Sequence, residues 1–427
     1  MSERFSVAIF GDGPAGLSCA HNLSKRGFNT IDVYGPERRD KSHRSIYSTD
    51  RILDAESTTL IPSEVRKPLS GIRVLTKTSD VRFDNAEGYF MIDYHRLLEK
   101  LGDLVEQDAS PKVIRYPMSV LNGARVDEER EHVNVWLDCE LKEYDYLVDA
   151  TGVEAKIIKK VDSLRKDENH LAEYLYGGVY DGALERDDMI LVIGPSGGTC
   201  YVCPSVCPGK VDAVFTAYGY KSNFRQFLSE GKYRLRALVD FIKDKHGIFL
   251  QRQFPEDIFS GIIRNQPVNK VLSERVYALG DSAGMAKPGT SQLIDRTIIM
   301  SSLLADELSR GNSPQDYLKH WRNQFKFDSF FFAGVLERLK EQRSNDLGGT
   351  FDAMAEAVRN KKGLLGFKDL EEFFVDGKIN HRFLLWMVSQ PMVRSGMFRA
   401  LMCNIKVKAG ILPISGEYSL PPLLTTD

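Results

Sequence analysis

A glycine-rich hexapeptide near the N-terminus constrains the fold of this chain more than any other segment. The residues GDGPAG at 11–16 follow Phe5–Phe10, a short apolar run that is typical of a buried strand. Leu17–Lys25 then has the character of a helix closed by Gly27, and Thr30–Tyr34 is typical of a second strand. Strand, glycine turn, helix and strand in this order predict a βαβ unit that binds a dinucleotide.

The glycines of this turn have distinct tasks in such a unit. Gly11 permits the tight turn, Gly13 lets the backbone approach a pyrophosphate, and Gly16 lets the helix pack closely on the strand. The helix N-terminus beside them offers unpaired N–H groups and a positive dipole to phosphate oxygens. We therefore expect five residues of the turn to bind the cofactor: Gly11, Gly13, Pro14, Ala15 and Gly16.

The acid that binds the adenosine ribose in such units is not at its usual place. It normally ends the second strand, where this chain has Tyr34. Glu37 lies about 20 residues past the last glycine of the turn and is our candidate for the ribose hydroxyls. Asp32 is the alternative, although its carboxylate could simply face solvent. The basic cluster that follows is either a solvated loop or a pyrophosphate contact, for which Arg44 is the candidate.

Two further buried strands return to the nucleotide unit. The segment HVNVWLDCELKEYDYLVDATG is typical of a hairpin that leads into a buried strand at Tyr146–Ala150. That strand ends at Thr151 and Gly152, which we place near the nucleotide edge of a parallel sheet. The segment RVYALGDSAG is typical of another strand, which ends at Gly280 and Asp281.

Segments of a different pattern interrupt this unit. Residues 71–93 alternate between apolar and polar side chains, and residues 187–220 are typical of strands joined by glycine turns. We expect an α/β fold, in which an antiparallel β-sheet substrate domain is inserted into a Rossmann-like domain. Three regions follow: residues 1–70, 94–155 and 270–312 for the nucleotide domain, 71–93 and 156–269 for the substrate domain, and 313–427 for a C-terminal helical region.

Three short motifs now stand in order along the chain. They are GDGPAG at 11–16, DATG at 149–152 and YALGDSAG at 277–284. The ordered set resembles FAD-dependent oxidoreductases of the hydroxybenzoate-hydroxylase and geranylgeranyl-reductase superfamily, over roughly residues 1–310. The resemblance implies that FAD is the cofactor and that the first motif holds its ADP half.

The resemblance also assigns the flavin end of the cofactor. It implies that Asp281 binds the ribityl chain, although an aspartate here could also cap a helix. Backbone N–H groups and a helix dipole beside the isoalloxazine would stabilise the reduced, anionic flavin. The residues implied there are Gly289, Thr290 and Ser291. The chain departs from the family by having Gln292 and Leu293 where a glycine is common.

The source of electrons is less defined by the sequence. Residues 194–198 follow an apolar run and could form a second nucleotide turn, as in reductases with two dinucleotides. They lack the GxGxxG spacing, however, and lead into TCYVCP rather than into a helix. Transient binding of NAD(P)H, or reduction by an electron-donor protein, fits the sequence better than a dedicated NAD(P)H domain.

Three cysteines with the spacing C-x2-C-x3-C lie at 200, 203 and 207. No fourth Cys or His lies nearby to complete a metal site, so we predict no metal. Geranylgeranyl reductases carry a Tyr-x-Trp-x-Phe-Pro segment on the corresponding strand, over the substrate cavity, and here Pro204 and the aromatic Tyr201 remain. We favour small strand residues that line a cavity, with a redox-active or disulfide pair as the alternative. Candidate proton donors are Tyr201, Cys203 and Tyr218.

We expect the substrate cavity between the strands at 199–218 and the loop at 288–292, with 71–93 as part of its wall. An apolar lining favours an apolar small-molecule substrate, because an unpaired polar group there costs on the order of 1–3 kcal/mol. The residues expected in that lining are Val202, Val206, Val211, Ala213 and Phe215.

The composition excludes some classes of function. The net charge of −2 gives no basic excess for nucleic acid, and no apolar run reaches the roughly 18 residues that span a membrane. The start of the chain is typical of a strand rather than a signal segment, so we expect a cytoplasmic protein with free thiols. The tail is rich in Phe, Leu and Met, and is either a helical cap on the core or a surface that contacts a membrane.

Two enzymatic functions remain. The first is a flavin reductase that saturates C=C bonds of isoprenoid or lipid-like substrates, with hydride from reduced FAD and a proton from a nearby acid. The second is a flavin monooxygenase, a hydroxylase or epoxidase, that transfers oxygen to an apolar or aromatic substrate. A non-catalytic FAD-binding scaffold is a third, less favoured class.

Overall fold

The computed structural model describes most of the first 311 residues and short parts of the remainder. The described residues are 5–35, 44–51, 53–76, 78–84, 86–107, 113–117, 121–127, 132–138, 140–157, 171–193, 199–251, 258–264, 272–273, 275–286, 293–311, 317, 319, 366–374, 380–382 and 385–386.

A six-stranded sheet carries the nucleotide unit. Its strand order is β18-β19-β12-β1-β2-β8, and every neighbouring pair except β18 and β19 is parallel. The strands are β1 (Ser6–Phe10), β2 (Thr30–Gly35), β8 (Val113–Pro117), β12 (Tyr146–Asp149), β18 (Leu272–Ser273) and β19 (Val276–Ala278). The expected return of two later strands to the first βαβ unit is thus confirmed.

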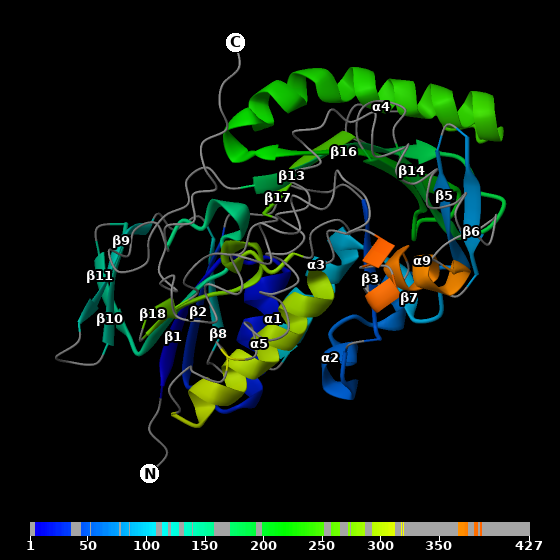
Figure 1. The fold of residues 1–427 in the computed structure, drawn as a ribbon. Helices are drawn as coiled ribbons and strands as arrows, with labels where there is room; N and C mark the ends of the chain where they lie inside the picture. Colours follow the sequence, from blue (N-terminus) through cyan, green and yellow to red (C-terminus); the bar gives the residue numbers. More distant parts are fainter. Residues whose placement is uncertain are drawn as a thin grey trace.

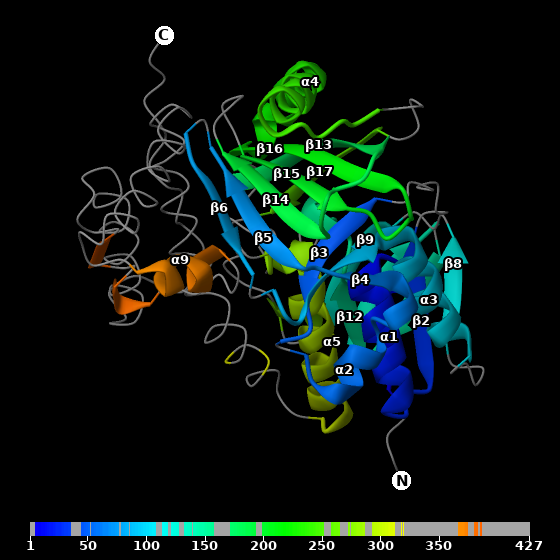
Figure 2. The ribbon, with the colours of Figure 1, turned by 90° about the vertical axis from the view of Figure 1, so that its right-hand side faces the viewer.

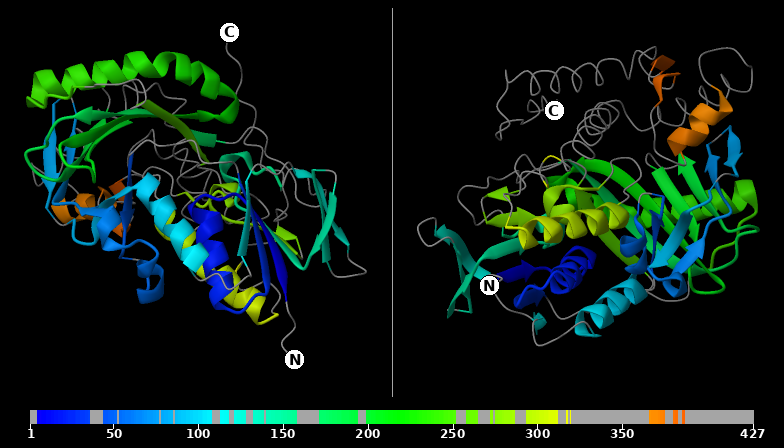
Figure 3. Two further views of the ribbon diagram at one scale, coloured as in Figure 1. Left: turned by 180° about the vertical axis from the view of Figure 1, so that it is seen from behind. Right: turned by 90° about the horizontal axis from the view of Figure 1, so that it is seen from below.

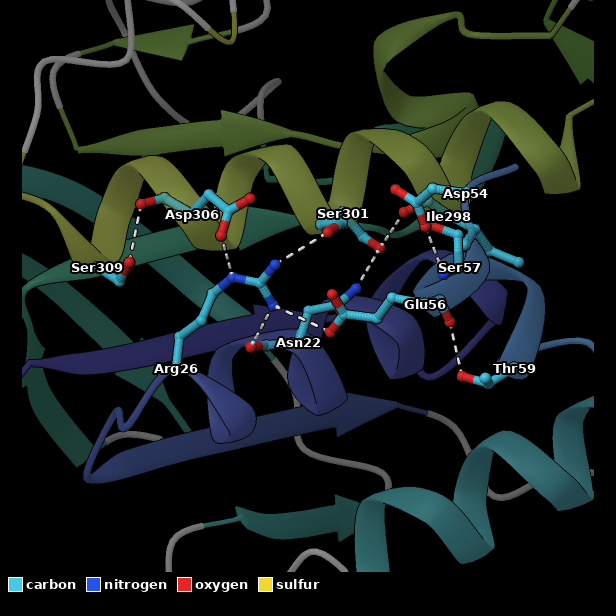
Figure 4. Close-up of polar contacts among 11 residues, drawn as sticks. Asn22, Arg26, Asp54, Glu56, Ser57, Thr59, Ile298, Ser301, Asp306 and Ser309 are labelled. Carbon is cyan, nitrogen blue, oxygen red and sulfur yellow. Dashed lines mark hydrogen bonds and ion pairs between the residues drawn. The ribbon is translucent and has the colours of Figure 1, made fainter. Parts of the chain in front are cut away.

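Helix α1 (Pro14–Lys25) packs between α3 (Tyr94–Gln107) and α5 (Ile294–Ser309), as the view from below in Figure 3 shows. Its residues from Ala15 to Leu23 are all buried. Polar contacts tie it to α5 (Figure 4): Asn22 Nδ2 donates to Ser301 Oγ at 3.0 Å, and Arg26 pairs with Asp306. These contacts hold the C-terminal half of α1 against α5.

A larger, mostly antiparallel sheet lies above the first one (Figures 1 and 2). Its order is β17-β13-β16-β15-β14-β5-β6, and only β14 and β5 run parallel. The strands are β5 (Gly71–Leu75), β6 (Asp80–Phe83), β13 (Leu171–Asp181), β14 (Asp188–Ile193), β15 (Thr199–Pro204), β16 (Lys210–Tyr220) and β17 (Ile258–Arg264). Helix α4 (Phe224–His246) covers its outer face.

Two small sheets complete the described core. One is the hairpin stack β11 (Glu140–Tyr144), β10 (His132–Leu137) and β9 (Leu121–Asp127); the other has the order β3 (Ser45–Thr49), β7 (Tyr89–Asp93), β4 (Arg66–Pro68). Residues 71–93 therefore divide between two sheets, since β5 and β6 join the large sheet and β7 does not. Strand β7 leads without a loop into α3, which holds it beside the parallel sheet.

The structure also describes short helices: α2 (Ala55–Thr59), η1 (Ser63–Val65), η2 (Gly152–Glu154), η4 (Lys221–Asn223) and η6 (Gly280–Ala283). Of the region from 313 onward, the structure describes α9 (Phe367–Phe374) beside β6, where the rings of Phe367 and Phe83 are 5.2 Å apart. The expected helical character of the rest lies outside the described residues. None of the described helices is both long and apolar enough to cross a membrane.

Candidate active site

A cavity of about 1130 Å³ lies where the carboxyl ends of β1, β12 and β19 face the large sheet. Ligands of α/β proteins bind at this edge of a parallel sheet. We call one side the turn wall: residues 10–15 and 150–152, Gly280 and Asp281. The opposite side is the sheet wall: Leu175, Met189, Tyr201, Cys203, Asp212, Val214, Phe259 and residues 261–263. Residues 44–47 lie between the walls, so all three motifs share one cavity with the antiparallel sheet.

Two glycines of the first turn are required by the protein itself. Gly11 has φ of +112°, and a Cβ atom there would overlap the carbonyl oxygen of Ala150. A Cβ atom on Gly16 would overlap the carbonyl oxygen of Gly11, so α1 could not approach β1 as closely. Both residues therefore fix the geometry of the turn, as their positions in the motif indicate.

Gly13 is different, because a Cβ atom there would meet no protein atom within 4 Å. Its φ of −74° and ψ of −174° are open to any residue, so neither strain nor packing requires a glycine. Gly13 caps α1 without a side chain, and Pro14 occupies the first turn of the helix. The resulting bare cradle of N–H groups fits the close approach of a pyrophosphate to a helix N-terminus.

The place of the missing ribose acid is filled from another segment. A Cβ atom on Gly35, the last residue of β2, would collide with the carboxylate of Asp12. Asp12 lines the cavity, has a side chain that is only 15% exposed, and pairs with Arg115 at 3.6 Å. An acid therefore does lie at the end of the second strand, but it comes from the GxG turn. Asp12 was not predicted from the sequence as a cofactor-binding residue.

Asp32, the alternative ribose acid, does not face solvent. Its carboxylate accepts hydrogen bonds from the hydroxyls of Tyr34 and Tyr144, and it is 5% exposed. Lys142 donates to the hydroxyl of Tyr34 at 3.3 Å. Asp32 belongs to this buried network below the sheet edge, since the lining of the cavity includes Tyr34 but not Asp32.

The DATG motif is organised by its aspartate. Asp149 is fully buried and accepts bonds from the N–H groups of Thr151 and Ile157 and from the Thr151 hydroxyl, at 2.6–3.1 Å. The Thr151 hydroxyl also accepts from the N–H of Lys156. Both side chains are thus committed to the turn, and Thr151 and Gly152 offer the cavity mainly their backbone.

Asp281 presents an unsatisfied acceptor to the cavity. Its Oδ1 is buried and has no hydrogen-bond partner among the described residues. Burial raises the pKa of Asp281 to about 7, although a backbone hydrogen bond and the charge of Arg264 oppose the shift. It does not cap η6 through its side chain, so the capping role is not observed there. Donors such as ribityl hydroxyls would satisfy this oxygen, and the site therefore fits FAD.

Arg44 lies at the junction of the two walls. Its guanidinium lies 4.5 Å from the ring centre of Tyr94 and 5.8 Å from that of Phe259. Arg44 lines the cavity, as expected for a ligand contact, and its planar group is held by aromatic faces.

The residues expected in the apolar lining of the sheet wall are the wrong set. Val202, Val211, Ala213 and Phe215 pack into the core beneath α4 instead. Successive side chains of a strand point to opposite faces, so the cavity receives the other set. Val206 follows β15 and is also absent from the described lining. The most apolar strand residues pack against the apolar face of α4 and are buried there.

Two of the candidate donors do lie on the cavity side. The Tyr201 hydroxyl donates to Glu173 Oε1 at 2.6 Å, and Glu173 is fully buried. Cys203 lines the cavity two residues further along β15. The third candidate, Tyr218, has its backbone opposite Glu173 in the sheet, but its side chain is outside the described set.

A further acid in the sheet wall was not predicted. Asp212 is 1% exposed, and its Oδ2 accepts the backbone N–H of Ser45 at 2.6 Å. Its Oδ1 has no hydrogen-bond partner in the described part of the chain. Burial, with the nearby charge of Asp93, raises the pKa of Asp212 to about 7, while Ser45 and Arg44 oppose the shift. The signal in the sequence was a lone acid inside the apolar strand VDAVF.

The three cysteines do not act as one group. Cys200 faces the core under α4, Cys203 faces the cavity, and the Sγ of Cys207 lies 3.9 Å from Asp93 Oδ2. All three are free thiols whose pKa is raised by burial. The preferred reading, of small residues that line a cavity, therefore holds for Cys203 and not for Cys200.

Some candidates fall outside the described residues. They are Glu37, Gly289, Thr290, Ser291 and the glycine-rich turn at 194–198. Their assignments stay predictions.

Relatives of the chain support the resemblance. No family model matches it. A digeranylgeranylglycerophospholipid reductase from Methanococcus vannielii is 22% identical, over 84% of this chain and 93% of that protein. A geranylgeranyl bacteriochlorophyll reductase-like structure from Thermoplasma acidophilum has a TM-score of 0.68 at 14% identity, over 93% of this chain and 99% of its own. The structure of a probable FAD-dependent monooxygenase from Pseudomonas aeruginosa has a TM-score of 0.59 at 16% identity. The match covers 82% of this chain and 100% of that protein's chain. The expected resemblance to FAD-dependent oxidoreductases is confirmed, and the two structures share the fold.

Proposed function

We propose that this chain is an FAD-dependent oxidoreductase that reduces C=C bonds of an apolar, isoprenoid or lipid-like substrate. The observation that carries the proposal is the single cavity, which joins a dinucleotide turn to a largely apolar sheet wall with a buried carboxyl. The similarity to a reductase named for an isoprenoid phospholipid supports the same substrate class.

FAD would lie along the turn wall. The N-terminus of α1 and the open backbone at Gly13 would hold the pyrophosphate, and Asp12 would accept the ribose hydroxyls at the end of β2. Asp281 would accept the ribityl hydroxyls through its unsatisfied Oδ1. Bound in its reduced form, FAD supplies a hydride. The chain's own residues hold it, exclude water and provide the proton.

The substrate would lie against the sheet wall. Leu175, Met189, Val214 and Phe259 give that wall an apolar surface suited to a hydrocarbon chain. NAD(P)H or an electron-donor protein would renew the reduced flavin. Contact of the C-terminal region with a membrane that carries the substrate belongs to this proposal as well.

A monooxygenase is the second candidate, because the same fold occurs in a probable FAD-dependent monooxygenase. One experiment separates the two. FAD-loaded protein is reduced without oxygen and mixed with a geranylgeranyl lipid, and the product is analysed by mass spectrometry. A reductase yields a product with added hydrogen. A monooxygenase leaves the substrate intact until oxygen enters, and then forms a hydroperoxyflavin spectrum and an oxygenated product.

A further inference from the structure

We propose that Asp212 is the general acid of this reaction and that its Oδ1 carries the proton which the substrate carbon accepts. The inference rests on the proposed reductase function and assigns its proton donor. No other described carboxyl on the large sheet both lines the cavity and keeps an oxygen without a hydrogen-bond partner.

The geometry separates the two oxygens of Asp212. The N–H of Ser45, donated from the start of β3, fixes Oδ2 at 2.6 Å. Oδ1 is buried and has no partner within the described chain, so a proton there is not shared with another acceptor. A buried carboxyl without a counter-ion in hydrogen-bond contact favours its neutral, protonated form. Asp212 therefore carries a proton in a wall that is otherwise largely apolar.

The charged groups around Asp212 lead to the same assignment. Asp93, on β7, accepts the N–H of Arg96 at 3.0 Å and pairs with its guanidinium at 3.6 Å, so Asp93 has partners for a negative charge. Two nearby carboxyls with unequal partners divide the roles of base and acid between them. Arg44 attracts a charged Asp212, but its guanidinium is stacked on Tyr94. Among the described residues, the thiols of Cys203 and Cys207 are further titratable neighbours.

The earlier candidates are less suited to donate. The Tyr201 hydroxyl already gives its proton to a hydrogen bond with Glu173 at 2.6 Å. Burial raises the pKa of the Cys203 thiol, and Asp212 raises it further. A donor with a pKa near the working pH transfers a proton most effectively. Burial places Asp212 there, with a pKa of about 7.

The reaction balances with Asp212 in this role. As the substrate π bond breaks, one carbon accepts the hydride that reduced FAD supplies, and its neighbour takes the proton from Asp212 Oδ1. The substrate gains two electrons and two hydrogens, and FAD is left oxidised until a nicotinamide or a donor protein reduces it. The carboxylate of Asp212 then regains a proton from water.

The test compares Asp212→Asn with Asp181→Asn, a matched control. Asp181 is an acid of the same sheet that pairs with Lys210 away from the cavity. Anaerobic reduction of a geranylgeranyl lipid should fall about 10²–10⁴-fold in Asp212→Asn and stay at the wild-type rate in Asp181→Asn. FAD affinity, measured by flavin fluorescence, should be unchanged in both.

A second readout does not need turnover. Infrared spectra of the FAD-loaded protein should show a protonated carboxyl that titrates near pH 7, vanishes in Asp212→Asn and persists in Asp181→Asn. The inference is overturned if that band is missing, if Asp212→Asn keeps the wild-type rate, or if Tyr201→Phe loses more activity than Asp212→Asn. A wild-type protein that binds FAD but reduces no alkene would instead overturn the proposed function.

Discussion

The two walls of the cavity are built in different ways. The turn wall consists mostly of backbone and small residues, and its shape follows from contacts such as that of Gly16 with the carbonyl of Gly11. The sheet wall consists of long side chains, such as Tyr201 and Asp212, whose presence depends on which face of a strand meets the cavity. The first wall is therefore specified locally, and the second by the packing of α4 on the opposite face. Mutations in the turn wall should therefore change FAD affinity, whereas mutations in the sheet wall should change turnover.

Gly13→Val should have the largest effect on the turn wall. The side chain would enter the open space beside the turn and block the approach of the pyrophosphate. Overpacking costs about 1–3 kcal/mol, so we expect FAD affinity to fall by up to about 150-fold. Flavin fluorescence titration measures the loss.

The thermal midpoint of FAD-free Gly13→Val should stay near that of the wild type, because no protein atom lies within 4 Å of the new Cβ. Gly13→Ala adds a smaller side chain at the same place and should reduce FAD affinity less than Gly13→Val does. An unchanged FAD affinity in Gly13→Val would mean that the turn has only a structural role. The turn wall would then not be the wall that binds FAD.

Asp12→Ala should have the next largest effect. Loss of a hydrogen bond to a charged group costs about 1.5–3 kcal/mol, or a factor of about 10 to 100 in FAD affinity. The effect should extend to ADP, which contains the same ribose, and should spare FMN, which lacks the adenosine half. Glu37→Gln is the matched control. If it weakens FAD and ADP while Asp12→Ala does not, the ribose acid is Glu37.

The turn wall could largely be predicted from the sequence. Strand β1, helix α1 and strand β2 appear where the apolar run, the glycines and the second run predict them. Each signal is contiguous, and Gly11 and Gly16 are required by contacts within the turn itself. Asp12 escaped prediction because its relevance depends on Gly35, a residue that is close to it only in the folded chain.

The sheet wall could be predicted only in part. The strands β15 and β16 were expected, and Tyr201 and Cys203 do face the cavity. Alternation along a strand defines two sets of side chains but does not tell which set faces a helix and which a ligand. The apolar set was assigned to the cavity, although α4 buries it, and Asp212 was missed for the same reason.

Tyr201→Trp tests the sheet wall. The larger ring would intrude on the cavity and would lose the hydrogen bond to Glu173. Overpacking of about 1–3 kcal/mol predicts a fall in turnover of roughly tenfold, with FAD affinity unchanged. Steady-state rates with the lipid and flavin titrations measure the two quantities. A variant that loses FAD but turns over its substrate normally would place the flavin, rather than the substrate, against β15.

Asp281 should give the smallest effect, in the pH dependence of FAD affinity. In the free protein burial raises its pKa to about 7, because Oδ1 lacks a donor. Ribityl hydroxyls that donate to the carboxylate would lower this pKa, so binding would release a proton. Affinity should therefore be full above pH 7 and decline as the pH falls through 7, by about tenfold between pH 8 and pH 6.

Asp281→Asn should remove this dependence and leave a flat profile, whereas Asp212→Asn, which changes a similar carboxyl in the sheet wall, should keep it. Asp281 and Asp212 are closely matched residues from opposite walls. Both are buried, and both have a carboxyl oxygen without a hydrogen-bond partner among the described residues, so they differ mainly in their place in the cavity. If Asp212→Asn flattens the profile and Asp281→Asn does not, the ribityl chain lies against the sheet wall, and the direction of FAD in the cavity is reversed.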